Sequence, residues 1–245
     1  EPGFPVTPKA RRDYDAVEFR VEKRFSRSFQ FQASYTWSRL WGNYGGLASS
    51  DENARFSPNV NRYFDLPFMS WDKNGKEVLG LLATDRPHTF KFFGTYSWNN
   101  KPGSTNFAPV FYAQSGTPLT TEVFMVSSVP IFVNGRGDLG RTPTLSQTDL
   151  QIAHDFKALA GERLRVRLET NFTNLFNHAT ATNYSVRYSH ANDGQVQFAH
   201  EVDFFKGFDY VKLMRDQKLR VDPRFNLPMD FLDPRELRFA MKLTF

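Results

Sequence analysis

ELRFAMKLTF, residues 236–245, is the stretch that decides the fold, because its side chains alternate in character without a break. The odd-numbered residues are all large and apolar, from Leu237 to Phe245, whereas the even-numbered ones are charged, small or hydroxylated. Successive side chains of a β-strand point to opposite sides. The stretch therefore predicts a strand with one apolar face and one polar face.

The composition suits strands of this kind along the whole chain. Hydrophobic residues make up 40% of the 245 residues and aromatic residues 16%, yet the mean hydropathy is only -0.51. Averaging over an apolar and a polar face gives such values, and no apolar run reaches the roughly 18 residues of a membrane-spanning helix. The absence of cysteine excludes disulfide bonds and thiolate metal sites. The net charge of +5 is spread along the chain, which disfavours a nucleic-acid partner.

Six earlier segments show the same alternation, so the sequence predicts about seven strands. Pro109 interrupts the fourth of these segments, and its apolar face stays open. Phe93 breaks the pattern of the third. The expected strands span residues 13–25, 29–38, 88–98, 104–115, 147–156, 163–177 and 236–245.

The connections between these strands alternate between short and long. Tight turns are expected at residues 26–28, 99–103 and 157–162, and long loops at residues 39–87, 116–146 and 178–235. Outer-membrane barrels have short periplasmic turns and long extracellular loops. The expected fold class is therefore all-β, an antiparallel transmembrane outer-membrane β-barrel in which the last strand runs from the outside to the periplasm.

The charge pattern agrees with apolar faces that contact lipid. An Arg or Lys facing lipid at mid-membrane costs roughly 2–4 kcal/mol, and the charged or titratable exceptions on the apolar faces, Lys23, His88 and His154, lie near strand ends. Aromatic side chains collect at the two levels where lipid meets water. The expected girdle consists of Tyr35 and Trp37 at the outer level and Tyr96 and Trp98 at the inner level.

Several short motifs lie at the ends of the expected strands. They are Arg11-Arg12-Asp13-Tyr14-Asp15-Ala16, Tyr35-Thr36-Trp37-Ser38, Asp85-Arg86-Pro87-His88, Gln114-Ser115-Gly116-Thr117-Pro118, Gly140-Arg141-Thr142-Pro143 and Asn171-Phe172-Thr173-Asn174-Leu175-Phe176-Asn177. In this order they resemble the C-terminal barrel of TonB-dependent receptors, in particular the Oar-like group that carries a carboxypeptidase-regulatory-like domain. The terminal strand resembles the closing strand of such barrels, whose assembly signal would be carried by Phe239, Met241, Leu243 and Phe245.

The resemblance implies more than this chain contains. Receptors of this family have a 22-stranded barrel filled by an N-terminal plug, and a periplasmic TonB box on that plug. The chain would hold about a third of such a barrel, without the plug, so it is expected to be the C-terminal piece of a receptor. The alternative is a small barrel with further strands hidden in the long loops, for example at Thr121 to Val133 or Gln195 to Phe204.

No catalytic or metal-binding group of residues is predicted, and no cofactor. The histidines are scattered, and no serine has the partners of a triad. The candidates for the barrel lumen, where they would face a plug or a substrate path, are Arg163, Arg165, Arg167, Glu169, Arg238 and Lys242. The candidates for ligand contacts in the long loops are Trp41, Tyr44, Trp71, Phe204, Phe208 and Tyr210, although packing of the loops on one another would also explain these aromatic residues.

The sequence therefore favours an outer-membrane receptor that takes up an unidentified ligand with the help of TonB. The implied partners are membrane lipid and lipopolysaccharide, the plug and the remaining barrel strands, and the TonB complex. A non-transporting surface or adhesion barrel is one alternative and a passive porin another. An enzyme is not expected, because nothing resembles an activated nucleophile or an acid and base pair.

Overall fold

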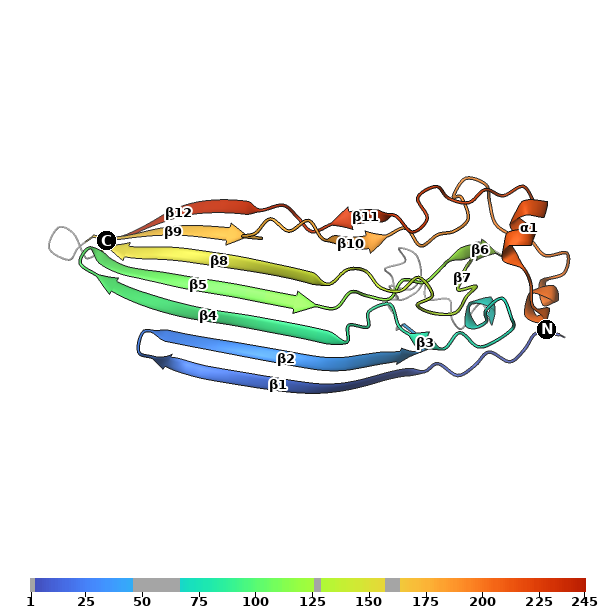
Figure 1. Ribbon diagram of the computed structural model, residues 1–245, viewed down its shortest axis with the longest axis horizontal. Coiled ribbons are helices and arrows are strands. Elements are labelled where there is room, and N and C mark those ends of the chain that lie inside the picture. The colour runs from blue at the N-terminus through green and yellow to red at the C-terminus, as the bar shows by residue number, and fades with distance from the viewer. Residues whose placement is uncertain (1–2, 46–66, 126–128, 157–163) are drawn as a thin grey trace.

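The structure is a computed structural model, which describes residues 3–45, 67–125, 129–156 and 164–245. One large antiparallel sheet runs along most of the molecule (Figure 1), and its long strands follow one another in chain order. Its strands are β1 (Arg12–Ser26), β2 (Phe29–Gly42), β4 (His88–Asn100), β5 (Gly103–Gln114), β8 (Leu145–Phe156), β9 (Arg165–Thr173) and β12 (Glu236–Thr244), with the short β3 (Gly80–Leu81) beside β2.

The register of these strands places every apolar face on the same side of the sheet. Directly opposed residues of neighbouring strands share a face. Tyr35 opposes Phe90, Phe92 opposes Phe111, and Leu168 opposes Met241. The apolar face is therefore continuous from β1 to β12. We call the other side of the sheet, which carries the charged residues of β9 and β12, the polar face.

The register also resolves the fourth strand, whose faces the sequence left open. Phe107 and Phe111 of β5 lie on the apolar face, since they oppose Tyr96 and Phe92. Val110 lies on the polar face directly opposite Phe93, the residue that breaks the alternation of β4. Their side chains are 42% and 48% exposed, so these two residues form an apolar island on the polar face.

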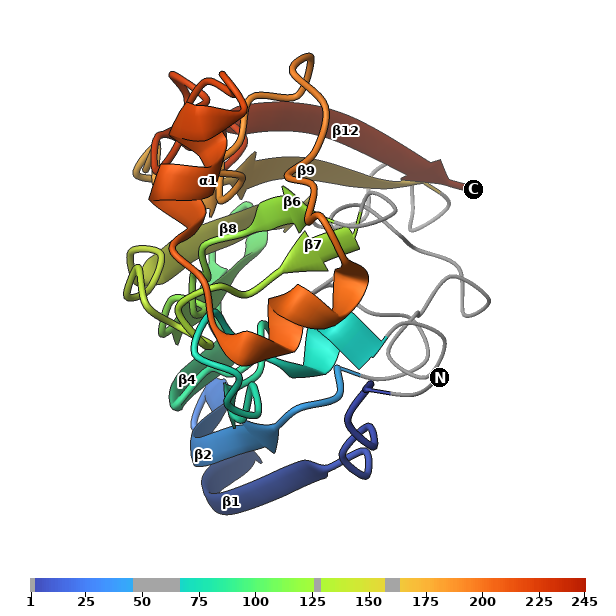
Figure 2. The ribbon, with the colours of Figure 1, turned by 90° about the vertical axis from the view of Figure 1, so that its right-hand side faces the viewer.

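The sheet is a curved wall with two open edges (Figure 2). Within the residues that the structure describes, β1 and β12 each pair with one neighbour only. An unpaired edge leaves a row of N–H and C=O groups without partners, and barrels remove such edges by closure. Also within the described residues, no helix is long and apolar enough to span a membrane.

The short turns lie at one end of the sheet. The turn from β1 to β2 consists of Arg27 and Ser28, which both have positive φ (52° and 73°), as a tight two-residue hairpin requires. The next turn ends at Gly103, where a Cβ atom would lie 1.9 Å from the carbonyl oxygen of Asp155. The third expected turn, residues 157–162, lies outside the described residues.

The sixth strand is shorter than the sequence suggests, because β9 ends at Thr173 and not at residue 177. Asn174 has a φ of 51° and leaves the extended conformation. Its buried side chain donates to the carbonyl oxygens of His178 (2.9 Å) and Asp233 (2.8 Å), and its backbone N–H donates to Asp149 Oδ1 (2.8 Å). Asn174 therefore stops the strand and ties the outer ends of β8, β9 and β12 together.

The long connections form a separate layer at the opposite end of the sheet from the C-terminus (Figure 1). This layer, the outer-loop domain, contains η2 (Pro67–Ser70), β6 (Val123–Met125), β7 (Val129–Ile131), β10 (Ala181–Tyr184), η3 (Glu201–Lys206), α1 (Tyr210–Asp216) and β11 (Pro228–Phe231). The possible strands at 121–133 exist as the β6–β7 hairpin. Those at 195–204 do not, because Glu201 begins a 3-10 helix and Val196 makes only an isolated bridge to Met125.

A hydrophobic core shared by all three long loops holds the outer-loop domain together. Its buried members are Phe68, Met69, Val123, Met125, Ile131, Val133, Val196, Phe204 and Met214. Phe4, which precedes β1, packs against Phe68 and Phe205 with ring centroids 5.8 and 5.3 Å apart. The loops are therefore one packed body, although the sequence separates them by whole strands.

Candidate functional site

The outer rim of the sheet is held by a buried ion pair. Asp85, whose side chain is 1% exposed, accepts the backbone N–H of Leu40 (2.6 Å) and pairs with Arg141. Arg141 also donates to the carbonyl oxygens of Asp85 (3.0 Å) and Gly116 (2.9 Å). The motifs that begin at Asp85, Gln114 and Gly140 thus meet in one network, which we call the rim clasp.

The backbone in the rim clasp is tightly packed. At Gly116 a Cβ atom would lie 1.6 Å from the carbonyl oxygen of Thr142, which only glycine avoids. The two segments also exchange hydrogen bonds, from Thr117 N to Thr142 Oγ1 (3.0 Å) and from Thr142 N to the carbonyl oxygen of Thr117 (2.9 Å). The rim clasp therefore fixes the wall of the cavity that lies beside it.

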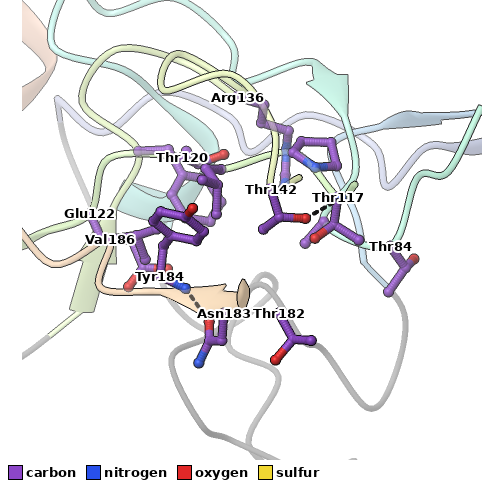
Figure 3. Close-up of a pocket in the computed structure, with 14 residues that line it drawn as sticks. Thr84, Thr117, Thr120, Glu122, Arg136, Thr142, Thr182, Asn183, Tyr184 and Val186 are labelled. Carbon is purple, nitrogen blue, oxygen red and sulfur yellow. Dashed lines mark hydrogen bonds between the residues drawn. The ribbon is translucent and has the colours of Figure 1, made fainter. Parts of the chain in front are cut away.

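This cavity, the outer pocket, lies between the loop that follows β5 and the strand β10 (Figure 3). Its volume is about 190 Å³. It is lined by Ala83, Thr84, Thr117, Pro118, Leu119, Thr120, Glu122, Phe132, Arg136, Thr142, Thr182, Asn183, Tyr184 and Val186. Seven of these residues carry a hydroxyl or amide side chain, five are apolar, and Glu122 and Arg136 are charged.

The walls of the outer pocket are fixed by contacts behind them. Arg136 donates to the carbonyl oxygen of Asn43 (3.0 Å) and lies over the Phe132 ring, 4.8 Å from its centroid. Glu122 is 5% exposed, and its backbone is bonded on both sides, to Val186 (2.9 Å) and Tyr188 (2.8 Å). The pocket is therefore preformed.

A second hollow of about 260 Å³ adjoins the outer pocket, because Thr84 lines both. Its other lining residues are Tyr14, Thr36, Ser38, Leu40, Arg86, Thr89 and Lys91. Thr36 and Thr89 oppose each other in the register and belong to the polar face. The outer pocket therefore continues onto the polar face and not onto the apolar one.

Arg165, Arg167, Glu169 and Lys242 lie on the polar face toward the end of the sheet that carries the short turns, and Arg238 lies on the same face near the outer end of β12. Arg167 bonds Glu169 (2.5 Å) and Asp155 (3.2 Å), and Arg238 bonds Glu236 (2.6 Å). Arg165 and Lys242 border a hollow beside Asp155. Arg163 lies outside the described residues.

The residues expected in the aromatic girdle lie on the apolar face. The side chains of Tyr35, Trp37, Tyr96 and Trp98 are 36%, 57%, 48% and 53% exposed. Trp37 opposes His88 near the outer end of the sheet, and Trp98 lies near the turn at Gly103. The Tyr35 hydroxyl also meets His88 Nδ1 at 2.8 Å. Their contact with the lipid interface stays a prediction.

The terminal strand lies at an open edge with its apolar residues exposed. Phe239, Met241 and Leu243 are 75%, 64% and 49% exposed, and Phe245 is fully exposed. The role of these residues as an assembly signal also stays a prediction. Exposure of this extent on a regular strand is costly in water and favourable in lipid.

The aromatic residues proposed as ligand contacts are mostly committed to packing. Phe204 is fully buried, and Trp71, Phe208 and Tyr210 pack against the same core. The packing alternative therefore describes these four residues better than contact with a ligand does. Two of the proposed residues, Trp41 and Tyr44, lie outside this core. The guanidinium of Arg39 lies over the Trp41 ring, 4.4 Å from its centroid. The backbone N–H of Tyr44 donates to the carbonyl oxygen of Arg11 (3.3 Å).

Two acidic residues, Asp193 and Asp222, form ion pairs with arginines within residues 185–227 of the outer-loop domain. Asp193 accepts from Arg220 Nε (2.9 Å) and Nη2 (2.5 Å), and these bonds hold the pKa of its carboxyl well below the usual range. Arg224 lowers the pKa of Asp222 in the same way. A carboxyl with a lowered pKa in the folded state adds stability that is present above the unfolded pKa of about 3.9 and is lost as pH falls through the folded value.

We therefore expect acid to loosen residues 185–227 before the sheet. Amide hydrogen exchange at pH 6 and pH 3, corrected for intrinsic rates, should show lower protection of this segment at pH 3. In Arg220→Met, the pKa of Asp193 returns toward its ordinary value, so the acid-dependent contribution of this carboxyl disappears. Protection of the segment is then lower already at pH 6, and it falls less between pH 6 and pH 3 than in the parent protein. The assignment fails if Arg220→Met and the parent protein show equal protection at pH 6 and an equal loss between pH 6 and pH 3.

The outer pocket is the main feature that sequence reasoning missed. Its hydroxyl residues are spread between positions 84 and 184 and share no spacing. The one indication in the sequence is that two of the motifs supply lining residues, Thr117 and Pro118 from the first and Thr142 from the second. Within the described residues, no group of three His, Cys, Asp or Glu side chains could hold a metal ion.

Comparisons with known proteins agree with this architecture. Residues 5–123 match the family described as outer membrane beta barrel domain. The chain is 28% identical to the TonB-dependent transporter Oar of Myxococcus xanthus, in an alignment that covers 97% of this chain and 23% of Oar. The chain thus spans about a quarter of that curated relative, according to the 23% coverage. No solved structure matches the chain. Residues 5–123 are thus similar to an outer-membrane β-barrel domain, and nearly the whole chain is similar to a TonB-dependent transporter.

Proposed function

We infer that the chain belongs to a receptor that captures a ligand at its outer loops and imports it with energy delivered through TonB. The observation that carries this proposal is the similarity to a TonB-dependent transporter along 97% of the chain. The geometry adds support, because a preformed outer pocket leads onto the polar face of the sheet. In a closed barrel that face lines the lumen, and the apolar face contacts lipid and lipopolysaccharide.

The two open edges support the second half of this proposal. β1 and β12 would pair with further strands of the same receptor, so that the wall closes around a plug. The charged row on the polar face, with Arg165, Arg167 and Lys242, is a suitable surface for that plug. The apolar island of Phe93 and Val110 is a second contact of this kind, since an apolar pair gains free energy when a partner covers it.

TonB binding is the direct test. The whole protein, purified from outer membranes, is expected to bind the purified periplasmic domain of TonB from the same organism in a pull-down and in surface plasmon resonance. The TonB domain of an unrelated bacterium with a different TonB sequence is the control for specificity. Absence of binding to its own TonB would count against transport and in favour of a surface or adhesion barrel.

Conductance separates the proposal from a passive porin. A plugged receptor in a planar lipid bilayer should show no steady open current, because the lumen is filled. A large steady current from the whole protein would favour the porin.

A further inference from the structure

We propose that the outer pocket binds one polyhydroxylated six-membered ring, a pyranose unit of a carbohydrate. This inference rests on the proposed receptor function and names its ligand class. The volume of the outer pocket suits a ligand of this size. A cavity of about 150 Å³ accommodates benzene, a single six-membered ring, and the outer pocket measures about 190 Å³. It therefore suits one ring with its substituents.

The lining of the outer pocket offers several hydroxyl groups to a ligand. Within the part of the chain that the structure describes, the side-chain hydroxyls of Thr84, Thr117 and Thr182 have no protein hydrogen-bond partner. Thr120 Oγ1 accepts the N–H of Gly137 (2.9 Å) and keeps its proton for donation. Hydroxyl groups both donate and accept. Several of them around a small cavity match a ligand whose own groups do the same.

The charged and aromatic residues fit the same ligand. Glu122 adds a carboxylate to the lining, and an ionised carboxylate accepts hydrogen bonds from hydroxyl groups. Arg136 is held by Asn43 and Phe132, so it serves as a wall more than as a mobile partner for an anion. The side chain of Tyr184 borders the same space as Thr142 and Thr182 (Figure 3), and its ring offers a flat surface to the C–H groups of a sugar.

The outer pocket is continuous with the second hollow. Thr84 joins the outer pocket to the second hollow, whose walls carry Thr36, Ser38 and Thr89. The same hydroxyl chemistry therefore extends from the outer-loop domain down the polar face. A chain of pyranose units could follow this path with one unit seated in the outer pocket.

Saturation-transfer-difference NMR on the whole detergent-solubilised protein tests the inference. The probes are the methyl α-pyranosides of glucose, galactose, mannose and N-acetylglucosamine, together with the dipeptide glycyl-serine. At least one pyranoside should give a signal. The double variant Thr84→Val and Thr182→Val keeps the shape of both side chains and should weaken this binding by about tenfold or more, since two hydrogen bonds are lost.

Matched variants make the result specific. The double variant Thr84→Ser and Thr182→Ser retains both hydroxyls and should keep the binding, as should Thr180→Val, a nearby threonine outside the pocket. The inference is overturned if no pyranoside binds, if binding is equal in the valine variant, or if only glycyl-serine binds. TonB binding is measured on the same preparations. If the protein binds TonB but no pyranoside, only the proposed ligand class is rejected. If it binds a pyranoside through the threonine hydroxyls but does not bind TonB, only the transport function is rejected.

Discussion

Replacement of Arg141 by methionine is expected to lower the free energy of unfolding by about 3–5 kcal/mol, the range for removing one partner of a buried ion pair. Asp85 would stay buried at 1% exposure, and among the residues that the structure describes its carboxylate would keep the backbone N–H of Leu40 as a donor. The carbonyl oxygens of Asp85 and Gly116 would also lose a donor. Urea unfolding of the whole protein in lipid, followed by tryptophan fluorescence, measures the change.

Two further variants isolate the buried charge as the cause. Adding Asp85→Asn to Arg141→Met removes the uncompensated charge and should recover part of the loss, so the two effects will not add. Arg11→Met removes an arginine whose side chain is 58% exposed and whose partner Asp13 is 45% exposed, and it should cost about 1 kcal/mol or less. Equal losses for Arg141→Met and Arg11→Met would contradict the role of the rim clasp.

Met241→Lys is expected to destabilise the protein by about 2–4 kcal/mol, because it places a charge on the apolar face of β12 in the middle of the strand. Met241 opposes Leu168 in the register, with no polar neighbour across the strand pair. The same urea titration in lipid measures this loss. Heat-modifiability on SDS gels should report a smaller folded fraction.

Ala240→Lys is the matched control, one residue away on the polar face. Ala240 opposes Glu169, so the new lysine meets an acidic neighbour and water. We expect a change of about 0.5 kcal/mol or less, as for an ordinary surface substitution. If both lysines cost the same, the two faces of the terminal strand have been assigned wrongly.

The fold class could be predicted because it depends on local pattern. A period of two separates the two faces of each strand whether or not its neighbours are known. The all-β outer-membrane class is confirmed by the matching family and by the sheet. Where the pattern was locally broken, at Pro109 and Phe93, only the pairing with the next strand could assign the faces.

The outer-loop domain could not be predicted because its contacts are non-local. Nothing near Phe204 in the sequence shows that it packs on Phe68 at a ring distance of 5.2 Å. The same holds for the outer pocket, which is built from segments that the strands carry to one end of the sheet. An aromatic residue in a loop can pack in a core or contact a ligand. The burial of its side chain, which the sequence does not show, distinguishes these two roles.

The shared core of the outer-loop domain also bears on folding kinetics. Phe4 and Phe68 precede most of the sheet along the chain, whereas Phe204 and Met214 follow β9, yet all four meet in one cluster. Contacts between segments so distant in sequence carry a large loop-closure entropy and form slowly. We therefore expect the outer-loop domain to form late, after the strands have brought its parts to one end of the sheet, at a rate that depends on the assembly of the sheet.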